Sequence, residues 1–202
     1  MRPRASRRDD VSALILAGGQ ATRMGGRDKR TLVVDGRTIF ERQVEVLAPR
    51  VAEILVSARA PVAGYRTVRD ARPGAGPLAG IAAGLAATAT RWLLVVAGDM
   101  PWIAGAVIDQ LLACAAAPRE AAVDAVGIRI GPLPEPLLCV LRVATARPEV
   151  ERRLATGRYK ASELLTGDGL AVTWLDEGAL RSVDPELRSL RNVNTPADLG
   201  AR

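Results

Sequence analysis

Short, continuous apolar runs alternate along the chain with segments whose apolar residues recur at helical spacing. The runs Val11–Ala17 and Trp92–Ala97 contain six or seven residues each and are bounded by polar or glycine residues. Runs of this length without polar alternation are typical of strands that are buried on both faces of a parallel sheet. Because helical segments separate them, the sequence predicts a three-layer α/β fold with a mostly parallel central sheet and right-handed crossovers.

The same patterns give the expected elements along the rest of the chain. The first helix is expected to have Thr38 as its N-cap and to end before Pro49. Further helices are expected over residues 77–85, 104–116, 144–154 and 162–165. The expected strands are 11–17, 53–57, 66–70, 92–97, 121–130, 137–142 and 171–175, and the prolines Pro132, Pro134 and Pro136 are expected in a loop.

Length and composition favour one domain. The chain has 202 residues, 49% of them hydrophobic, which is enough for a sizeable core, and it has no internal linker that would separate two domains. Residues 1–10 carry four arginines and are expected to be a disordered basic tail. Residues 11–202 are expected to form the single domain.

The residue types that are missing restrict the chemistry. The chain contains no histidine and only two cysteines, Cys114 and Cys139. Triads of Ser-His-Asp type, Cys-His nucleophiles and zinc sites built from His or Cys are therefore excluded. Catalysis must use carboxylates, lysine, arginine, hydroxyls, backbone amides or a hard metal ion.

The charge distribution argues against nucleic acid as a partner. The formal net charge is +6, but outside the tail the arginines are scattered among acidic residues, and the chain has six aromatic residues in all. Nucleic-acid binders need a concentrated basic face or a stacking surface. No apolar run approaches the ~18 residues of a membrane span, and we therefore expect a soluble, cytoplasmic protein.

Residues suited to binding phosphate and metal follow the expected strands. The first strand runs into a loop, Gly18–Lys29, with four glycines and a lysine, while Ser57, Asp70 and Asp99 stand at or just after the ends of three later strands. Ligands of open α/β sheets bind at the carboxyl ends of the strands. Backbone amides of a glycine loop can approach phosphates, and one or two carboxylates plus substrate phosphates suit Mg²⁺.

Structural explanations compete with each of these assignments. The glycine loop has neither Walker A nor GxGxxG spacing, so its glycines could serve turns only. Asp99 could be the N-cap of a helix entered after Pro101, and Asp70 could close a turn before Pro73. The glycines of 74–84 could serve only to pack a helix.

Four segments together resemble the molybdenum cofactor guanylyltransferase family of MobA type. They are LILAGGQATRMGGRDK (14–29), RDARPGAGPLAGIAAGL (69–85), VVAGDMPWI (95–103) and RNVNTPADL (191–199). They come in the family's order and spacing, and with the weaker EPLLCVLR and GRYKASELL they cover nearly the whole chain after Asp10. The first signature is shared by the wider nucleotidyltransferase superfamily, and the combination is fairly specific to this branch.

The resemblance implies a Rossmann-like nucleotidyltransferase fold that transfers GMP from GTP to molybdopterin, requires Mg²⁺ and releases pyrophosphate. It assigns residues 11–117 to a nucleotide-binding half and 118–202 to an acceptor-side half. The implied GTP-binding residues are Leu16, Ala17, Gly18, Gly19, Lys29, Ser57, Asp70 and Asp99. The implied catalytic residues are Arg23, Lys29 and Asp99, with Asp99 as the metal ligand, and the implied acceptor-binding residues are Arg158, Lys160, Asn192 and Asn194.

Other functions remain open from the sequence. Relatives often have asparagine where this chain has Ser57, and the four acceptor-side residues could instead be a helix cap and solvated charges. The alternatives are a related nucleotidyltransferase that uses CTP or another phosphorylated acceptor, and a non-catalytic carrier of nucleotide or cofactor. The sequence LAGG in the first loop favours guanine by resemblance. The expected partners are GTP and molybdopterin, with contacts to molybdoenzymes or cofactor-delivery proteins.

Overall fold

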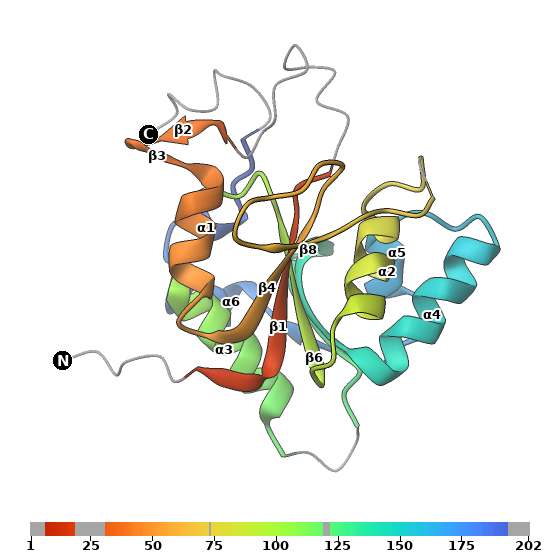
Figure 1. Ribbon diagram of the computed structural model, residues 1–202. Coiled ribbons are helices and arrows are strands. Elements are labelled where there is room, and N and C mark those ends of the chain that lie inside the picture. Colours follow the sequence, from red (N-terminus) through yellow and green to blue (C-terminus); the bar gives the residue numbers. More distant parts are fainter. Residues whose placement is uncertain (1–6, 19–30, 73, 119–121, 194–202) are drawn as a thin grey trace.

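The computed structural model describes residues 7–18, 31–72, 74–118 and 122–193 of the chain. Its centre is a seven-stranded sheet (Figure 1). In spatial order the strands are β5 (Arg66–Val68), β4 (Val51–Ser57), β1 (Arg8–Leu16), β6 (Trp92–Ala97), β8 (Leu133–Arg142), β7 (Ala125–Ile130) and β9 (Val172–Leu175). Only β8 runs antiparallel to its neighbours in this sheet. The predicted mostly parallel sheet is confirmed.

Helices cover both faces of the sheet, which makes three layers (Figure 1). One face carries α1 (Ile39–Leu47), α3 (Gly105–Ala116) and α6 (Glu177–Arg181), and the other carries α2 (Pro77–Ala87), α4 (Val143–Ala155) and α5 (Ser162–Thr166). Two hydrophobic cores lie between the layers, one on each side of the sheet. None of the helices in the described ranges is long and apolar enough to cross a bilayer.

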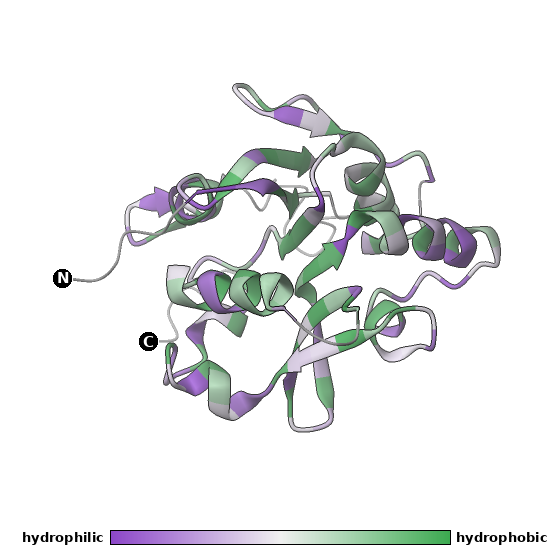
Figure 2. Cartoon of the chain, turned by 90° about the horizontal axis from the view of Figure 1, so that it is seen from below, coloured by the Kyte–Doolittle hydropathy of each residue, from purple (hydrophilic) through white to green (hydrophobic). Residues whose placement is uncertain are grey.

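Burial on both faces explains the uninterrupted apolar strands. Every residue of β6 is buried, and the central strands are coloured as hydrophobic along most of their lengths in Figure 2. Side chains of a strand alternate between the two faces. Leu94 and Val96 therefore enter the core with α3, whereas Leu93 and Val95 enter the core with α2 and α4.

Helix α1 begins as its sequence predicts. Thr38 is the N-cap, and its hydroxyl accepts a hydrogen bond from the Glu41 N–H at 3.1 Å. The Glu41 carboxylate in turn accepts from the Thr38 N–H at 2.8 Å, which completes a capping box and lowers the pKa of Glu41. Before this cap, β2 (Val33–Val34) and β3 (Arg37–Thr38) form a small hairpin.

Helix α2 packs closely against β1 and β4 because two of its residues lack side chains. A Cβ atom added at Gly84 would lie 2.6 Å from Cδ2 of Leu14, and one added at Gly80 would lie 2.7 Å from Oγ of Ser57. Both distances are too short for real carbon contacts. The helix-packing role considered for the glycines of 74–84 is therefore present at Gly80 and Gly84.

Two expectations are corrected by the structure. Strand β1 begins at Arg8, whose N–H donates to the Arg50 carbonyl at 3.0 Å, so residues 8–10 do not belong to a disordered tail. Strand β8 includes Pro134 and Pro136, so the expectation of a loop at these prolines is wrong. Strand β8 pairs with β6 only from Arg142 to Leu138. The half of β8 that contains the prolines therefore pairs with β7 alone. Proline is tolerated there because one side of the strand forms no hydrogen bonds to a neighbouring strand.

Candidate active site

The carboxyl ends of four parallel strands lie level with one another. Leu16, the last residue of β1, is in register with Ser57 at the end of β4 and with Ala97 at the end of β6. Ser57 is in turn in register with Val68, the last residue of β5. Four segments carry the expected nucleotide-binding residues, and all four leave the sheet at the same edge. This agrees with the prediction that the carboxyl ends of the strands lie together.

The first loop continues the strand ladder beyond β1. The Ala17 N–H donates to the Ser57 carbonyl at 3.0 Å, and the Leu16 carbonyl accepts from the Gly98 N–H at 3.0 Å. Ser57 itself is buried, and its hydroxyl faces α2 at Gly80. The structure therefore gives Ser57 a packing role between β4 and α2. Gly18 follows at the edge, whereas Gly19, Arg23 and Lys29 lie outside the described residues.

A buried glutamine fixes the turn that carries Asp99. Gln43 of α1 is fully buried, and its Nε2 donates to the carbonyls of Ala97 at 2.7 Å and Met100 at 3.1 Å. Asp99 is half-buried between them. Since Ala104 is the N-cap of α3, Asp99 does not cap that helix, and the structural explanation considered for it is wrong.

Replacing Gln43 with methionine tests this support. The Gln43→Met variant keeps the side-chain length but leaves the two carbonyls without their donor, so we expect the free energy of unfolding to fall by about 1–3 kcal/mol. Nucleotide turnover should fall as well, because the Asp99 turn loses its fixed position. Urea unfolding and steady-state kinetics check the two effects, and unchanged values of both would contradict the role of Gln43.

Glu135 is a second carboxylate near Asp99, and it is not among the residues expected at the site. The antiparallel register of β6 and β8 pairs Trp92 with Arg142 and Val96 with Leu138, so the two chains leave this ladder at the same end, and Glu135 lies close enough to Asp99 to be affected by its charge. Burial raises the pKa of Glu135 and the charge of Asp99 raises it further, while a hydrogen bond from the Leu137 N–H lowers it. The only sequence signal is the glutamate in the EPLLCVLR segment, where the neighbouring prolines favour a loop.

Val193, the last of the described residues, lies beside Asp99. The Val193 N–H donates to the Asp99 carbonyl at 2.8 Å, and the Val193 side chain is buried with Val34 and Ile39. The adjacent Asn192 is exposed. The fold thus brings residues from the two ends of the domain to one place, although Asn194 lies outside the described residues.

Asp70 lies at the same edge but closes a local turn. One of its carboxylate oxygens accepts from the Arg72 N–H at 2.6 Å. Asp70 also lines a cavity of about 510 Å³ between the β5–α2 connection, α2 and α4, together with Arg69 and Arg72. The turn considered from the sequence is therefore present, and the carboxylate also borders an open space.

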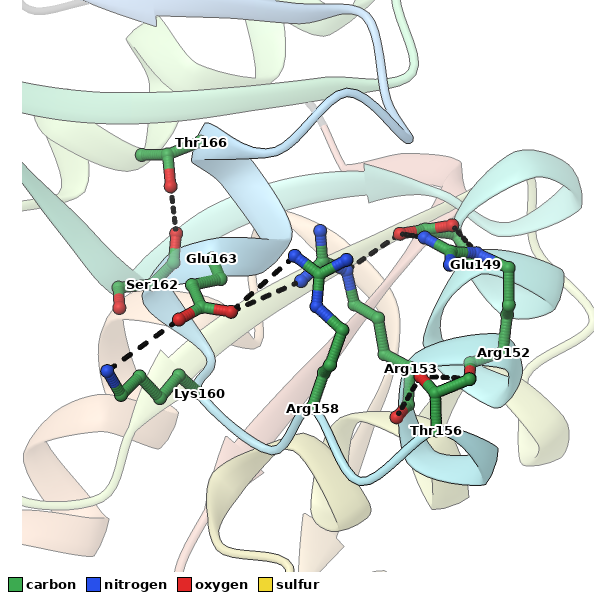
Figure 3. Close-up of polar contacts among 9 residues, drawn as sticks. All are labelled: Glu149, Arg152, Arg153, Thr156, Arg158, Lys160, Ser162, Glu163 and Thr166. Atoms are coloured by element: carbon green, nitrogen blue, oxygen red, sulfur yellow. Dashed lines mark hydrogen bonds and ion pairs between the residues drawn. The ribbon is translucent and has the colours of Figure 1, made fainter.

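Arg158 and Lys160 follow α4 and face Glu163 of α5 (Figure 3). Their charged nitrogens lie 3.7 Å from the two carboxylate oxygens of Glu163, Arg158 Nη2 from Oε2 and Lys160 Nζ from Oε1. They are therefore exposed charges that share one carboxylate as an ion-pair partner. The structure brings these two expected acceptor-side residues together around one carboxylate.

The donor set at the edge fits a hard cation that also binds phosphate. Within the described ranges, no group of three or more Asp, Glu, Cys or His residues could hold a metal ion alone. Asp99 and Glu135 do provide two carboxylates, and Mg²⁺ characteristically binds through one or two carboxylates together with substrate phosphates and water. The arrangement is suited to a metal ion that arrives with a nucleotide.

Comparisons with known proteins show which family the chain belongs to. The family described as MobA-like NTP transferase domain matches residues 13–171. A protein of Chloroflexus aggregans named probable molybdenum cofactor guanylyltransferase is 38% identical over 94% of this chain and 91% of its own length.

Two solved structures share the fold. The crystal structure of molybdopterin-guanine dinucleotide biosynthesis protein A from Archaeoglobus fulgidus has a TM-score of 0.76 and 28% identity, covering 94% of this chain and 95% of that one. The 2-C-methyl-D-erythritol 4-phosphate cytidylyltransferase of Thermus thermophilus has a TM-score of 0.66 at 17% identity, covering 93% and 94%, and shows the fold alone. The chain is a nucleotidyltransferase and belongs to the molybdenum cofactor guanylyltransferase family.

Proposed function

We propose that this protein transfers GMP from GTP to the terminal phosphate of molybdenum-molybdopterin, forming the guanine dinucleotide cofactor and releasing pyrophosphate. The observation that carries the proposal is the level carboxyl edge, where Leu16, Asp99 and Val193 lie together in a chain of this family. The curated relatives are named for guanylyl transfer, which disfavours CTP and a carrier role.

The loop after β1 is the proposed nucleotide site. Leu16, Ala17, Gly18 and Gly19 would contact the guanosine, Asp70 would contact the nucleotide from the neighbouring strand, and Ser57 would support the loop through its backbone carbonyl. Arg23 and Lys29 would neutralise the phosphates. Asn192, Asn194, Arg158 and Lys160 would form the acceptor side.

The reaction needs alignment and charge neutralisation more than a base. An oxygen of the acceptor phosphate attacks the α-phosphorus of GTP, a new phosphorus–oxygen bond forms, and the bond to the β-phosphate breaks with its electron pair passing to pyrophosphate. The acceptor phosphate is already an anionic nucleophile, so the reaction does not need a histidine as a base, and the chain contains none. Rate enhancement then comes from positioning and from electrostatic stabilisation of the transition state.

Asp99 and Glu135 are the proposed metal-binding carboxylates. Mg²⁺, when bound, would offset charge on the transferring phosphate. Asp99 would be held in place by the Gln43-supported turn, and Glu135 by the Leu137 N–H and the start of β8.

The proposal is tested by measuring pyrophosphate release from GTP and, in parallel, from CTP, with Mg²⁺ and metal-loaded molybdopterin. We expect release from GTP that depends on the pterin, with little from CTP. A reaction without pterin is the control for hydrolysis. Preferred use of CTP would identify a cytidylyltransferase, and no release from protein that binds GTP would overturn catalysis of this transfer.

A further inference from the structure

Glu163 lies among three cationic side chains (Figure 3). Besides its 3.7 Å contacts with Arg158 and Lys160, its Oε2 lies 3.9 Å from Nη1 of Arg153. All three distances exceed hydrogen-bond length. One carboxylate thus balances three cations at long range, which leaves these cations able to make shorter contacts with another anion.

Arg153 forms the buried floor of this cluster. Its side chain is 1% exposed, and its Nε donates to Oε1 of Glu149 at 2.7 Å. Its Nη1, the atom nearest Glu163, is buried and has no hydrogen-bond partner among the described residues. Buried donors are nearly always paired, so an unpaired one that faces a cluster of cations indicates a place for an acceptor atom.

The cluster has an excess of positive charge and is open to solvent. Arg152, Arg153, Arg158 and Lys160 oppose only Glu149 and Glu163, an excess of two positive charges. The Glu163 side chain is 38% exposed, that of Arg158 48% and that of Lys160 79%. An anion from solution can therefore reach the position that the Glu163 carboxylate occupies.

The topology places the cluster toward the same edge as Asp99. Helix α4 follows Arg142, which is in register with Trp92 at the amino end of β6. The helix then runs back toward the carboxyl edge, and the segment with Arg158 and Lys160 follows its end (Figure 1).

We propose that Arg153, Arg158 and Lys160 form a binding site for a tetrahedral oxyanion, and that Glu163 is an internal counter-ion which this anion displaces. The proposal rests on the proposed function for its physiological ligand, because the proposed acceptor carries a terminal phosphate, which is a tetrahedral oxyanion. Glu163 is in this view a positioning residue. It keeps the cations gathered while the site is empty, and it weakens the binding of every anion that must take its place.

Isothermal titration of the full chain with inorganic phosphate, and separately with molybdate, tests the site. Glu163→Gln keeps the side-chain shape and removes the competing charge, so we expect at least one of the two anions to bind about 10-fold more tightly than to wild type. Glu151→Gln is the matched control, because Glu151 is an exposed carboxylate on α4 paired with Arg147. Affinity in that control should stay within about twofold.

A second variant shows whether the gain arises in the cluster. Adding Arg158→Gln to Glu163→Gln should abolish it, while GTP affinity stays unchanged in all variants and reports that they are folded. A gain for either tetrahedral anion supports the site, and a gain for phosphate assigns the acceptor phosphate as its ligand. Equal or weaker anion binding in folded Glu163→Gln would overturn the site.

The two proposals fail separately. Tighter anion binding without pterin-dependent pyrophosphate release would leave the oxyanion site standing and remove the proposed function. Normal release without any gain in anion binding would overturn the oxyanion site and leave the proposed function standing.

Discussion

Asp99→Asn is expected to lower the turnover number for pyrophosphate release by about 10³-fold or more, the cost typical of losing a principal electrostatic stabiliser. The amide keeps the size of the side chain but removes the charge that would hold the cation. Because Gln43 fixes the turn through the carbonyls of Ala97 and Met100, the turn should keep its shape in the variant. Single-turnover kinetics at saturating GTP would measure the effect.

Asp9→Asn is the matched control for this loss. Asp9 is 93% exposed in the first residues of β1, at the opposite edge of the sheet, and the same charge is removed there. Its turnover should remain at the wild-type value. Titration with Mn²⁺ followed by electron paramagnetic resonance adds a readout besides activity, since Asp99→Asn should weaken Mn²⁺ binding in the presence of GTP. Turnover near the wild-type value in Asp99→Asn would refute the metal role.

Glu149→Met is expected to give the largest loss of stability, about 3–5 kcal/mol in the free energy of unfolding, as when one partner of a buried ion pair is removed. The variant leaves the Arg153 guanidinium buried, with only the distant Glu163 to balance it. The loop after α5 packs closely against this pair. A side chain at Gly167 would collide with Arg153, and a side chain at Gly169 would collide with Glu149. The site therefore cannot relax easily to let water reach the charge.

Chemical denaturation of Glu149→Met and Glu151→Met measures the difference between a buried and an exposed pair on one helix. The Glu151 pair with Arg147 is more than half exposed on both sides, and its loss should cost at most about 1 kcal/mol.

Hydrogen bonds from Arg152 and Arg153 lower the pKa of Glu149 from its ordinary 4.5. This stabilisation is complete above pH 4.5 and is lost as the pH falls through the lowered pKa. The gap between wild type and Glu149→Met should therefore narrow in acid, and equal losses in the two variants would contradict the buried pair.

The sheet and its functional edge could be predicted because their signals are local. Strand ends are visible where Val11–Ala17 and Trp92–Ala97 meet glycine or aspartate, and a parallel sheet brings such ends together. The β2–β3 hairpin, which is not among the expected elements, also has a local signal in Asp35-Gly36, whose φ values of 50° and 81° are those that Asp-Gly turns provide.

Other parts of the site depend on contacts between distant segments. Glu135 comes near enough to Asp99 to be affected by its charge because β8 inserts antiparallel between β6 and β7, and nothing in the sequence near Glu135 indicates that neighbour. The burial of Arg153 could not be predicted from the sequence either. Arginine is abundant throughout this chain, so a single buried one is not distinguishable from the exposed majority by residue type.

The hydrogen-bonded pairing of β6 with β8 affects whether the two halves of the chain can be separated. The residues that resemble a nucleotide-binding half end at Ala117, yet the last strand of that half, β6, pairs on one side with a strand from the other half. A fragment ending there would present an entirely apolar edge strand with open hydrogen-bonding groups, which is a template for aggregation. A fragment that ends at Ala117 is therefore expected to aggregate, whereas the whole chain covers both edges of β6 with β1 and β8.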